Sequence, residues 1–291
     1  MTSVLYDVPG PKARRRSLIA SIVTGVALAA AFAWVIATLA GEGLFDYERW
    51  DIFQDPTVWE GLLVRGLLVT LQVAALASVL AVLLGSLFAI LRLSSVKLVR
   101  IPTTVILEFF RGMPVLLMMF FILILFSTSQ YWAVVLGLGL YNGAIIGEAL
   151  RSGIVALPKG QREAGLALGL TPLKARLLIE FPQAFRAMAP IVVAQLVVLL
   201  KDSSLGYIVG LNELVRQQRL SAEFFGFSQY GFSFFVITLG MFLVVNLSLS
   251  WFARRLAART PGARASRRAA RAAIGESADT TAIRTTGAGG A

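Results

Sequence analysis

Charged residues inside apolar sequence are the candidates for chemistry in this chain. Lys201 and Asp202 follow a long apolar run, and Ser203 and Ser204 come directly after them. A charge in the hydrocarbon core of a membrane costs at least about 2.5–3.5 kcal/mol, so these side chains are expected to face a wet cavity or a partner. Two interpretations stay open. The residues line the path or gate of a translocated solute, or they form a salt bridge to another span that locks the helices together.

Three further charges lie near the ends of apolar runs. Arg111 precedes Pro114, and a proline breaks one backbone hydrogen bond and can kink a helix. Glu148 and Arg151 are three residues apart, which places them on one helix face, where they can pair. Each has a structural interpretation, as a kink with a snorkelling arginine or as an interfacial ion pair. The alternative is a role at the gate and in coupling motion to it.

The chain lacks several residue types on which catalysis and metal binding usually depend. The 291 residues include no cysteine and no histidine, which removes thiolate chemistry and the commonest general base and metal ligand. No GxxxxGK[ST] phosphate-binding loop occurs, so the chain is not expected to hydrolyse ATP itself. We therefore expect no catalytic residue, no cofactor and no metal.

Composition indicates a membrane protein. The chain is 57% hydrophobic and only 15% charged, whereas soluble domains are about a quarter charged. The net charge of +11 is distributed in short runs beside apolar segments. This is typical of cytoplasmic membrane loops and argues against a nucleic-acid interface, which would need a basic groove with interleaved aromatic residues.

Six apolar stretches are long enough, or nearly so, to cross a hydrocarbon core, which needs about 20 helical residues. Strand-like alternation is not sustained along them, so we expect helices and not a β-barrel. The predicted fold class is an all-α integral membrane protein with six transmembrane helices. The stretches are Leu18–Ala40, Gly66–Leu91, Val105–Phe126, Trp132–Leu150, Ala187–Val209 and Phe232–Ala253.

The charges of the connecting segments predict how these helices are oriented. Basic residues fill the N-terminal segment, the turn around Lys97, the region 158–186 and the C-terminal tail, whereas the segment 41–60 carries six acidic residues and one arginine. The positive-inside rule then places both termini in the cytoplasm. A cleaved signal peptide at Leu18–Ala40 is the alternative, but the stretch exceeds the usual apolar region of about 7–15 residues.

The cytoplasmic segment 158–182 is predicted to form a helical hairpin. Gln161–Leu168 can make about two turns, and Gly169 suits the left-handed position that ends a helix. Thr171 is placed as an N-cap, with Pro172 at the first position of a second helix. That helix is expected to stop at about Glu180, before Pro182.

The first helix of the hairpin carries small residues, so another surface can approach its backbone closely. Local pattern alone leaves two interpretations open: an amphipathic linker at the membrane interface, or a knob that inserts into a groove of a cytoplasmic partner. The spacing of Glu163-Ala164-Gly165, Gly169, Ile179 and Pro182 is that of EAA-x3-G-x9-I-x-L-P. It resembles the signature of the membrane subunits of ABC importers, with Gly165 and Phe181 as departures.

This resemblance implies that the hairpin is the coupling loop that docks into a cleft of an ATPase subunit. The residues then implicated in ATPase coupling are Gln161, Glu163, Ala164, Gly165, Gly169 and Pro182. In the same family, the stretch "KDSSL" that begins at Lys201 favours the pathway interpretation of Lys201, Asp202, Ser203 and Ser204.

Longer stretches resemble the polar amino-acid permease subfamily: Leu68–Arg92, Glu108–Phe121, Gly147–Ala164 and Phe181–Gly206. The phrase "LGLYNG" at Leu138–Gly143 is similar to one in actinobacterial glutamate permeases and bears only on substrate. The resemblance implies the transmembrane domain of a type I ABC importer over 66–253. Outside it lie a basic tail (1–17), a first helix (18–40), an acidic extracytoplasmic loop (41–65) and a basic, disordered tail (254–291).

The first functional hypothesis is therefore a permease subunit of an ABC importer for a polar amino acid in the bacterial cytoplasmic membrane. The implied partners are two ATP-binding subunits, a second permease subunit, an extracytoplasmic solute-binding protein and lipid. A stand-alone secondary transporter or channel would instead predict an inverted repeat with broken helices, and no convincing repeat is seen. An intramembrane enzyme would need residues that this chain lacks.

Overall fold

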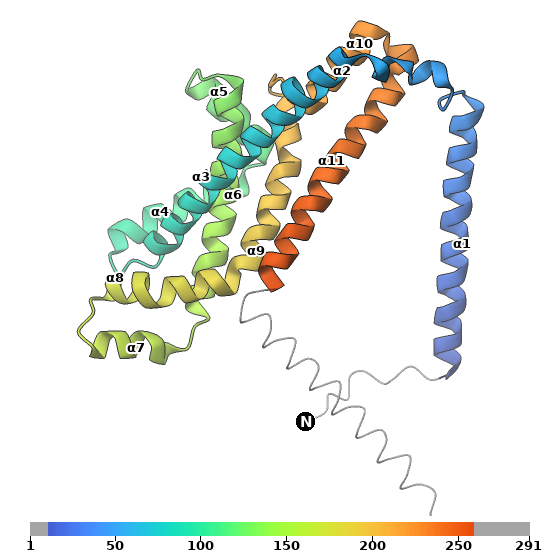
Figure 1. Ribbon diagram of the computed structural model, residues 1–291. Coiled ribbons are helices and arrows are strands. Elements are labelled where there is room, and N and C mark those ends of the chain that lie inside the picture. Colours follow the sequence, from blue (N-terminus) through green and yellow to red (C-terminus); the bar gives the residue numbers. More distant parts are fainter. Residues whose placement is uncertain (1–10, 259–291) are drawn as a thin grey trace, which may run out of the picture.

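The structure is a computed structural model that describes residues 11–258 (Figure 1). Most of the two predicted tails, 1–17 and 254–291, lies outside the described residues. Within 11–258 every regular element is a helix, which confirms the all-α fold class. In chain order the elements are α1 (Pro11–Gly41), η1 (Tyr47–Arg49), η2 (Asp51–Gln54), α2 (Pro56–Glu60), η3 (Gly61–Leu67), α3 (Leu68–Arg92), α4 (Lys97–Gly112), α5 (Val115–Leu125), α6 (Gln130–Val155), α7 (Lys159–Ala167), α8 (Pro172–Ala175), η4 (Arg176–Glu180), α9 (Phe181–Asp202), η5 (Ser203–Tyr207), α10 (Leu214–Phe225) and α11 (Phe227–Ala258).

Among residues 11–258, five helices are long and apolar enough to cross a membrane, and a sixth span is reached if α4 and α5 are counted together. The bundle has two ends, which we name by their elements. The hairpin end carries α7 and α8, and the far end carries α2 and α10 (Figure 1). Spans begin or end several residues beyond the predicted limits, because the helices continue past the apolar run into polar sequence.

The predicted third span, Val105–Phe126, is not one helix. The chain bends by 112° between α4 and α5, which is a break and not the expected kink. Met113 adopts an extended conformation, as is usual for a residue before proline, and Pro114 has no N–H to continue the helix. With 11 residues, α5 is too short to cross a membrane alone.

The second hairpin helix does not stop before Pro182, contrary to the prediction. Residues Pro172–Tyr207 form one continuous helical span, in which Arg176–Glu180 is a π-helical turn. A proline in an α-helix clashes with the carbonyl four residues earlier and leaves it unbonded. The wider π turn, with hydrogen bonds from residue i to i+5, lies directly before Pro182 and relieves both problems.

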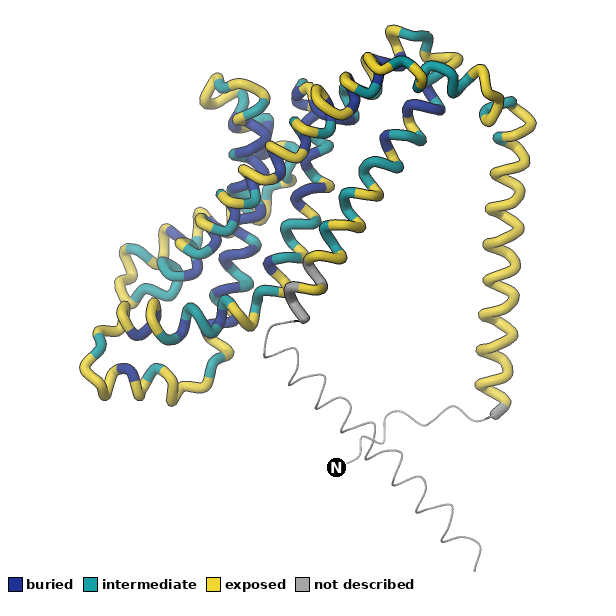
Figure 2. The backbone as a smooth tube through the Cα atoms, viewed as in Figure 1, coloured by how far each residue is buried: buried dark blue, intermediate teal, exposed yellow. Residues whose placement is uncertain are grey.

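The core is the contact between α3 and α6, which approach closely through small residues. Figure 2 shows α6 as the most buried of the long helices. Small residues recur every four positions on both helices, so each helix has one face of small side chains that the other backbone can approach closely. These residues are Ala77, Ala81, Gly85 and Ala89 on α3 and Gly139, Gly143 and Gly147 on α6.

A second, smaller core closes the far end. Val58, Leu62, Leu214, Ala222 and Phe234 are buried together between α2, η3, α10 and α11. The segment that precedes α2 is tied to the start of α11 by hydrogen bonds, such as the one from the Arg49 side chain to the Ser228 carbonyl at 3.2 Å. Helix α1 stands apart from the bundle and is exposed over nearly its full length (Figure 2).

Replacing Gly85 with alanine is expected to weaken the α3–α6 contact. The new Cβ would lie 2.7 Å from Ile146 Cγ2 and 3.0 Å from the Gly143 carbonyl oxygen, which is backbone and cannot move aside. We expect Gly85→Ala to destabilise the protein by about 1–3 kcal/mol, measured by thermal unfolding in detergent micelles. Gly240→Ala, where a Cβ meets nothing within 4 Å, is the matched control. Equal stability of the two variants would contradict the close packing.

Candidate functional site

The hairpin has the local geometry that its sequence predicts. Helix α7 ends at Ala167, and Gly169, two residues later, has a φ of +82°, a left-handed conformation that favours glycine. The N–H of Gly169 donates to the Leu166 carbonyl, and that of Leu170 to the Gly165 carbonyl, so the helix end is satisfied. Thr171 caps α8 by accepting a hydrogen bond from the Lys174 N–H.

Some of the residues expected to couple to an ATPase face the α8–α9 helix, and others are exposed to solvent. Gly165 is buried against Ile179, and the Gln161 side chain accepts a hydrogen bond from Gln183 at 3.2 Å. These two residues therefore attach α7 to the α8–α9 helix. Glu163 and Ala164 are exposed and are available to a partner. Pro182 lies within the continuous helix behind the hairpin.

The hairpin also exposes apolar side chains. Leu168 is 83% exposed, and Leu173 is 53% exposed. Together with the exposed Glu163 and Ala164, they give the hairpin an exposed surface of mixed acidic, small and apolar residues. Such a surface is typical of a docking site for another protein.

Arg111, Glu148 and Arg151 are brought together in one network of charges at the hairpin end. Glu148 pairs with Arg151 at 2.6 Å and with Arg92 of α3. Arg92 also pairs with Glu108 of α4 at 2.7 Å, and Glu108 pairs with Arg111 at 3.2 Å. Sequence analysis singled out neither Glu108 nor Arg92, because the contact between them joins two different helices.

This network joins three helices, α3, α4 and α6, in a region that is only partly exposed. The Arg92 side chain is 15% exposed and that of Glu148 is 23% exposed. A hollow of about 540 Å³, lined by Glu108, Arg111 and Glu148 with Gly112 and Ile145, opens next to it. Partly buried ion pairs with several hydrogen bonds fix the relative position of helices, because removing one partner leaves the other charge uncompensated.

Lys201 and Asp202 lie at the opposite end of α9 from the hairpin. Within the part of the chain that the structure describes, neither residue makes an ion pair. Lys201 is exposed and Asp202 is half-buried. Directly after them the helix tightens to the 3-10 segment η5 (Ser203–Tyr207), and the hydroxyls of Ser203 and Ser204 donate to the carbonyls of Leu200 and Lys201.

The charge network and Lys201 occupy different levels of the bundle. Helices α6 and α9 run antiparallel, and the hydrogen bond between Asn142 and Gln195 shows which residues of the two helices lie side by side. Glu148 lies six residues from Asn142 towards the hairpin end, and Lys201 lies six residues from Gln195 towards the far end. At 1.5 Å per residue the two charged sites are separated by roughly 18 Å along the bundle.

One face of α9 is exposed along its whole length. Its members recur at helical spacing and are small or aliphatic until the lysine: Ala187, Pro190, Ile191, Ala194, Val198 and Lys201. A helix face of small residues that ends in a charge suits contact with a second subunit or with a polar path, and suits a lipid surface poorly.

Sequence reasoning missed two buried polar contacts. Asn142, which is fully buried in α6, accepts a hydrogen bond from Gln195 of α9 at 2.7 Å. At the far end, Glu213 is fully buried and accepts hydrogen bonds from the Arg216 N–H at 3.0 Å and from the Thr70 hydroxyl at 3.4 Å. The only signal was a polar residue type within or next to apolar sequence.

Glu213 links α3 to α10 and titrates near neutral pH. Burial raises its pKa from 4.5 to about 7, and hydrogen bonds from backbone N–H groups and from Thr70 offset this only in part. The Leu214 N–H donates in turn to the Thr70 hydroxyl at 3.1 Å. The carboxyl group therefore caps α10 and holds it against α3.

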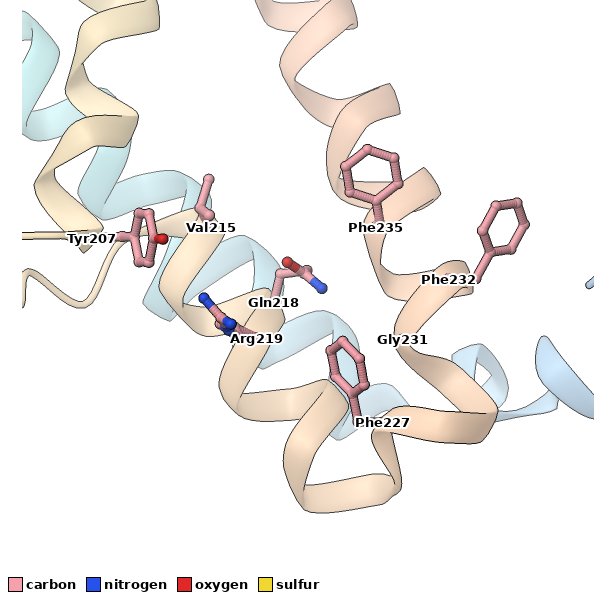
Figure 3. A pocket seen from close by; sticks show the side chains of 8 residues that line it. All are labelled: Tyr207, Val215, Gln218, Arg219, Phe227, Gly231, Phe232 and Phe235. Carbon is pink, nitrogen blue, oxygen red and sulfur yellow. The ribbon is translucent and has the colours of Figure 1, made fainter.

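A second hollow, of about 430 Å³, lies between α10 and α11 at the far end (Figure 3). Phe227 and Phe235 line it from α11, and Gln218 and Arg219 line it from α10. Arg219 also faces Glu223 at 3.7 Å, so its charge is partly balanced. None of the residues predicted from the sequence lines this hollow.

Comparison with known families identifies the chain. The family described as "Binding-protein-dependent transport system inner membrane component" matches residues 81–261, more than half of the chain. The chain belongs to this family. It is accordingly an inner-membrane protein, and α1 and the segment up to the first turns of α3 lie outside the matched region.

Its relatives are permease proteins of amino-acid ABC transporters. The glutamate transport system permease protein GluD of Corynebacterium glutamicum is 39% identical over 226 residues, covering 75% of this chain and 82% of that protein. The probable glutamine ABC transporter permease protein GlnP of Bacillus subtilis is 34% identical over 201 residues, covering 67% and 91%. These relatives support the predicted assignment to the permeases of amino-acid ABC importers.

Solved structures agree on the fold. A crystal structure of an amino acid ABC transporter with histidines has a TM-score of 0.61 and 28% identity, covering 69% of this chain and 95% of that one. An inward-facing structure of the MetNI methionine ABC transporter, at 19% identity and a TM-score of 0.58, shares the fold alone.

Glu213 is expected to make stability depend on pH. Its pKa is raised in the folded protein, so its contribution is fully present below about pH 4.5 and is lost as the pH rises to about 7. One pKa unit corresponds to about 1.36 kcal/mol, so we expect a loss of about 1–3 kcal/mol across this window. Glu213→Gln, which cannot ionise, should flatten the profile of thermal stability against pH. The exposed Glu223→Gln is the control, and an unchanged profile for Glu213→Gln would exclude this role.

Proposed function

We propose that this permease subunit imports a polar amino acid, with glutamate favoured, using ATP that separate subunits hydrolyse. The observation that carries the proposal is the hairpin, which exposes Glu163 and Ala164 on a rigid helix attached to the long α8–α9 span. A force applied to α7 reaches the membrane through that attachment. The glutamate-permease relative and the "LGLYNG" stretch favour an acidic substrate.

In this proposal the hairpin end faces the cytoplasm, as do both termini. Two ATP-binding subunits dock on the hairpins of two permease subunits, and an extracytoplasmic solute-binding protein delivers the amino acid at the far end. The exposed face of α9 lies at the pore or against the second permease subunit. Closure of the ATP-binding subunits then favours one of two arrangements of the permease, which gives alternating access without chemistry in this chain.

The proposed pathway includes Lys201, Asp202, Ser203 and Ser204, and the network of Arg111, Glu148 and Arg151 holds the helices near the inner gate. The lack of an ion pair at Lys201 within the described residues supports the pathway role. A charge that has no ion-pair partner among the described residues, next to the 3-10 segment η5, can meet a substrate carboxylate.

The direct test is reconstitution in proteoliposomes with the ATP-binding subunits and the binding protein. We expect uptake of radiolabelled L-glutamate that requires ATP and all partners. Co-purification of the ATP-binding subunit with the permease tests the partnership independently. Uptake by the permease alone would support a secondary transporter and contradict the proposal.

Two changes in the hairpin should uncouple ATP hydrolysis from uptake. Gly169→Pro cannot adopt a φ of +82° and removes the hydrogen bond to Leu166, and Glu163→Arg reverses an exposed charge at the proposed contact. We expect normal membrane insertion but loss of ATP-driven uptake in both. Gly160→Ala, where a Cβ meets nothing within 4 Å, is the control. Full uptake in both variants would show that the hairpin does not couple.

Lys201→Met keeps most of the side-chain length and removes the charge. A charge-assisted hydrogen bond to a carboxylate contributes about 1.5–3 kcal/mol, so uptake of L-glutamate at low concentration should fall about ten- to a hundredfold. Assembly should be unchanged, because Lys201 has no ion pair among the described residues. Lys97→Met is the control for loss of an exposed lysine. If Lys201→Met assembles poorly while the surviving complexes transport normally, the residue has a structural role only.

A further inference from the structure

One continuous helix connects the hairpin with the Lys201–Asp202 site. Residues Pro172–Tyr207 form a single span, with the hairpin attached near its start and the 3-10 segment η5 at its end. The attachment is close, since Gly165 contacts Ile179 and Gln161 bonds Gln183. The attachment precedes the point where the helix changes direction (Figure 1), so a displacement of α7 acts on the first turns of α9.

Helix α9 packs on α6 mostly through apolar atoms. Gly153 of α6 leaves room for Met188, whose Cγ would lie 2.5 Å from a Cβ at that position. Val192, Leu199 and Leu200 are buried on the same side. Such contacts are non-directional, so they fix the axial position of α9 on α6 less sharply than a hydrogen bond does.

A single side-chain hydrogen bond joins α6 to α9 among the described residues. Gln195 Nε2 donates to Asn142 Oδ1 at 2.7 Å. Asn142 is held in turn, because its Nδ2 donates to the Leu138 carbonyl of its own helix at 2.9 Å and the residue is fully buried. Only one orientation of the Asn142 amide serves both contacts.

Sliding would break this bond where water is scarce. A buried amide that loses its partner in an apolar environment has nothing to replace it. The bond is therefore directional and fixes one level of α9 on α6, midway between the charge network and Lys201. Tilting about this level leaves the bond intact, whereas axial sliding breaks it.

We propose that the Asn142–Gln195 hydrogen bond is the pivot of α9. It turns a displacement of the hairpin into a tilt that reaches Lys201 and Asp202, and it prevents axial slippage of the helix. Both are positioning residues, which act through α9. The inference rests on the function proposed above, and it adds the point at which a displacement of the hairpin becomes a tilt of α9.

The first test is the number of amino-acid molecules imported per ATP hydrolysed by the complete complex in proteoliposomes, with L-glutamate as the probe. Asn142→Leu and Gln195→Leu preserve size and remove the hydrogen bond. We expect each to lower the ratio about two- to thirtyfold, a range typical of mutations that lie between two coupled sites. The exchanged pair Asn142→Gln with Gln195→Asn keeps the combined length and should restore the ratio.

A merely structural role makes a different prediction. It lowers the yield of assembled complex and leaves the ratio of the remaining complexes unchanged, and this result would overturn the pivot. Ratios that fall in the single variants and recover in the exchanged pair support it.

A second test does not depend on transport. The chain has no cysteine, so spin labels can be placed at Val155→Cys on α6 and Arg186→Cys on α9, both exposed. We expect one narrow distance distribution in the wild-type background and a broadened one in Gln195→Leu, with recovery in the exchanged pair. An unchanged distribution overturns the pivot. Absence of ATP-driven uptake by the wild-type complex would overturn the proposed function, and the spin-label distances would still decide the pivot.

Discussion

Close contact between α3 and α6 is the constraint on which the rest of the structure depends. Lipid tails are as apolar as leucine side chains, so helices in a membrane gain little from burying apolar area and associate where their backbones fit closely. Two faces of small residues meet here: Ala77, Ala81, Gly85 and Ala89 on α3, and Gly139, Gly143 and Gly147 on α6. This contact makes α6 the central helix, and α5 and α9 then pack on its remaining faces.

Polar contacts divide the bundle into three levels. The network around Glu148 joins α3, α4 and α6 at the hairpin end, the Asn142–Gln195 bond joins α6 to α9, and Glu213 with Thr70 joins α10 to α3 at the far end. Each level fixes a position that apolar packing leaves free, because hydrogen bonds and ion pairs are directional and costly to break in a low dielectric. Between these levels the helices of the described part of the chain meet through non-directional apolar contacts.

The continuous helical span through α8 and α9 connects the hairpin to the membrane-spanning bundle. A short helix that ended before Pro182 would have been a separate knob, joined to the membrane by a flexible link. The π turn at Arg176–Glu180 instead carries the helix through the proline. The hairpin and the site around Lys201 are consequently joined by continuous helical chain, which changes direction between α8 and the upper part of α9 (Figure 1).

The sequence by itself determined the features that depend on nearby residues. Six apolar stretches predicted an all-α membrane fold, and Gly169, Thr171 and Pro172 defined the hairpin turn, because turn and cap geometry is local. The tertiary structure alone decided the break at Pro114, the passage through Pro182, and the pairing of Arg92 with Glu108 and Glu148. Whether a proline kinks, breaks or is absorbed depends on packing, and which charges meet depends on helices that are far apart in the chain.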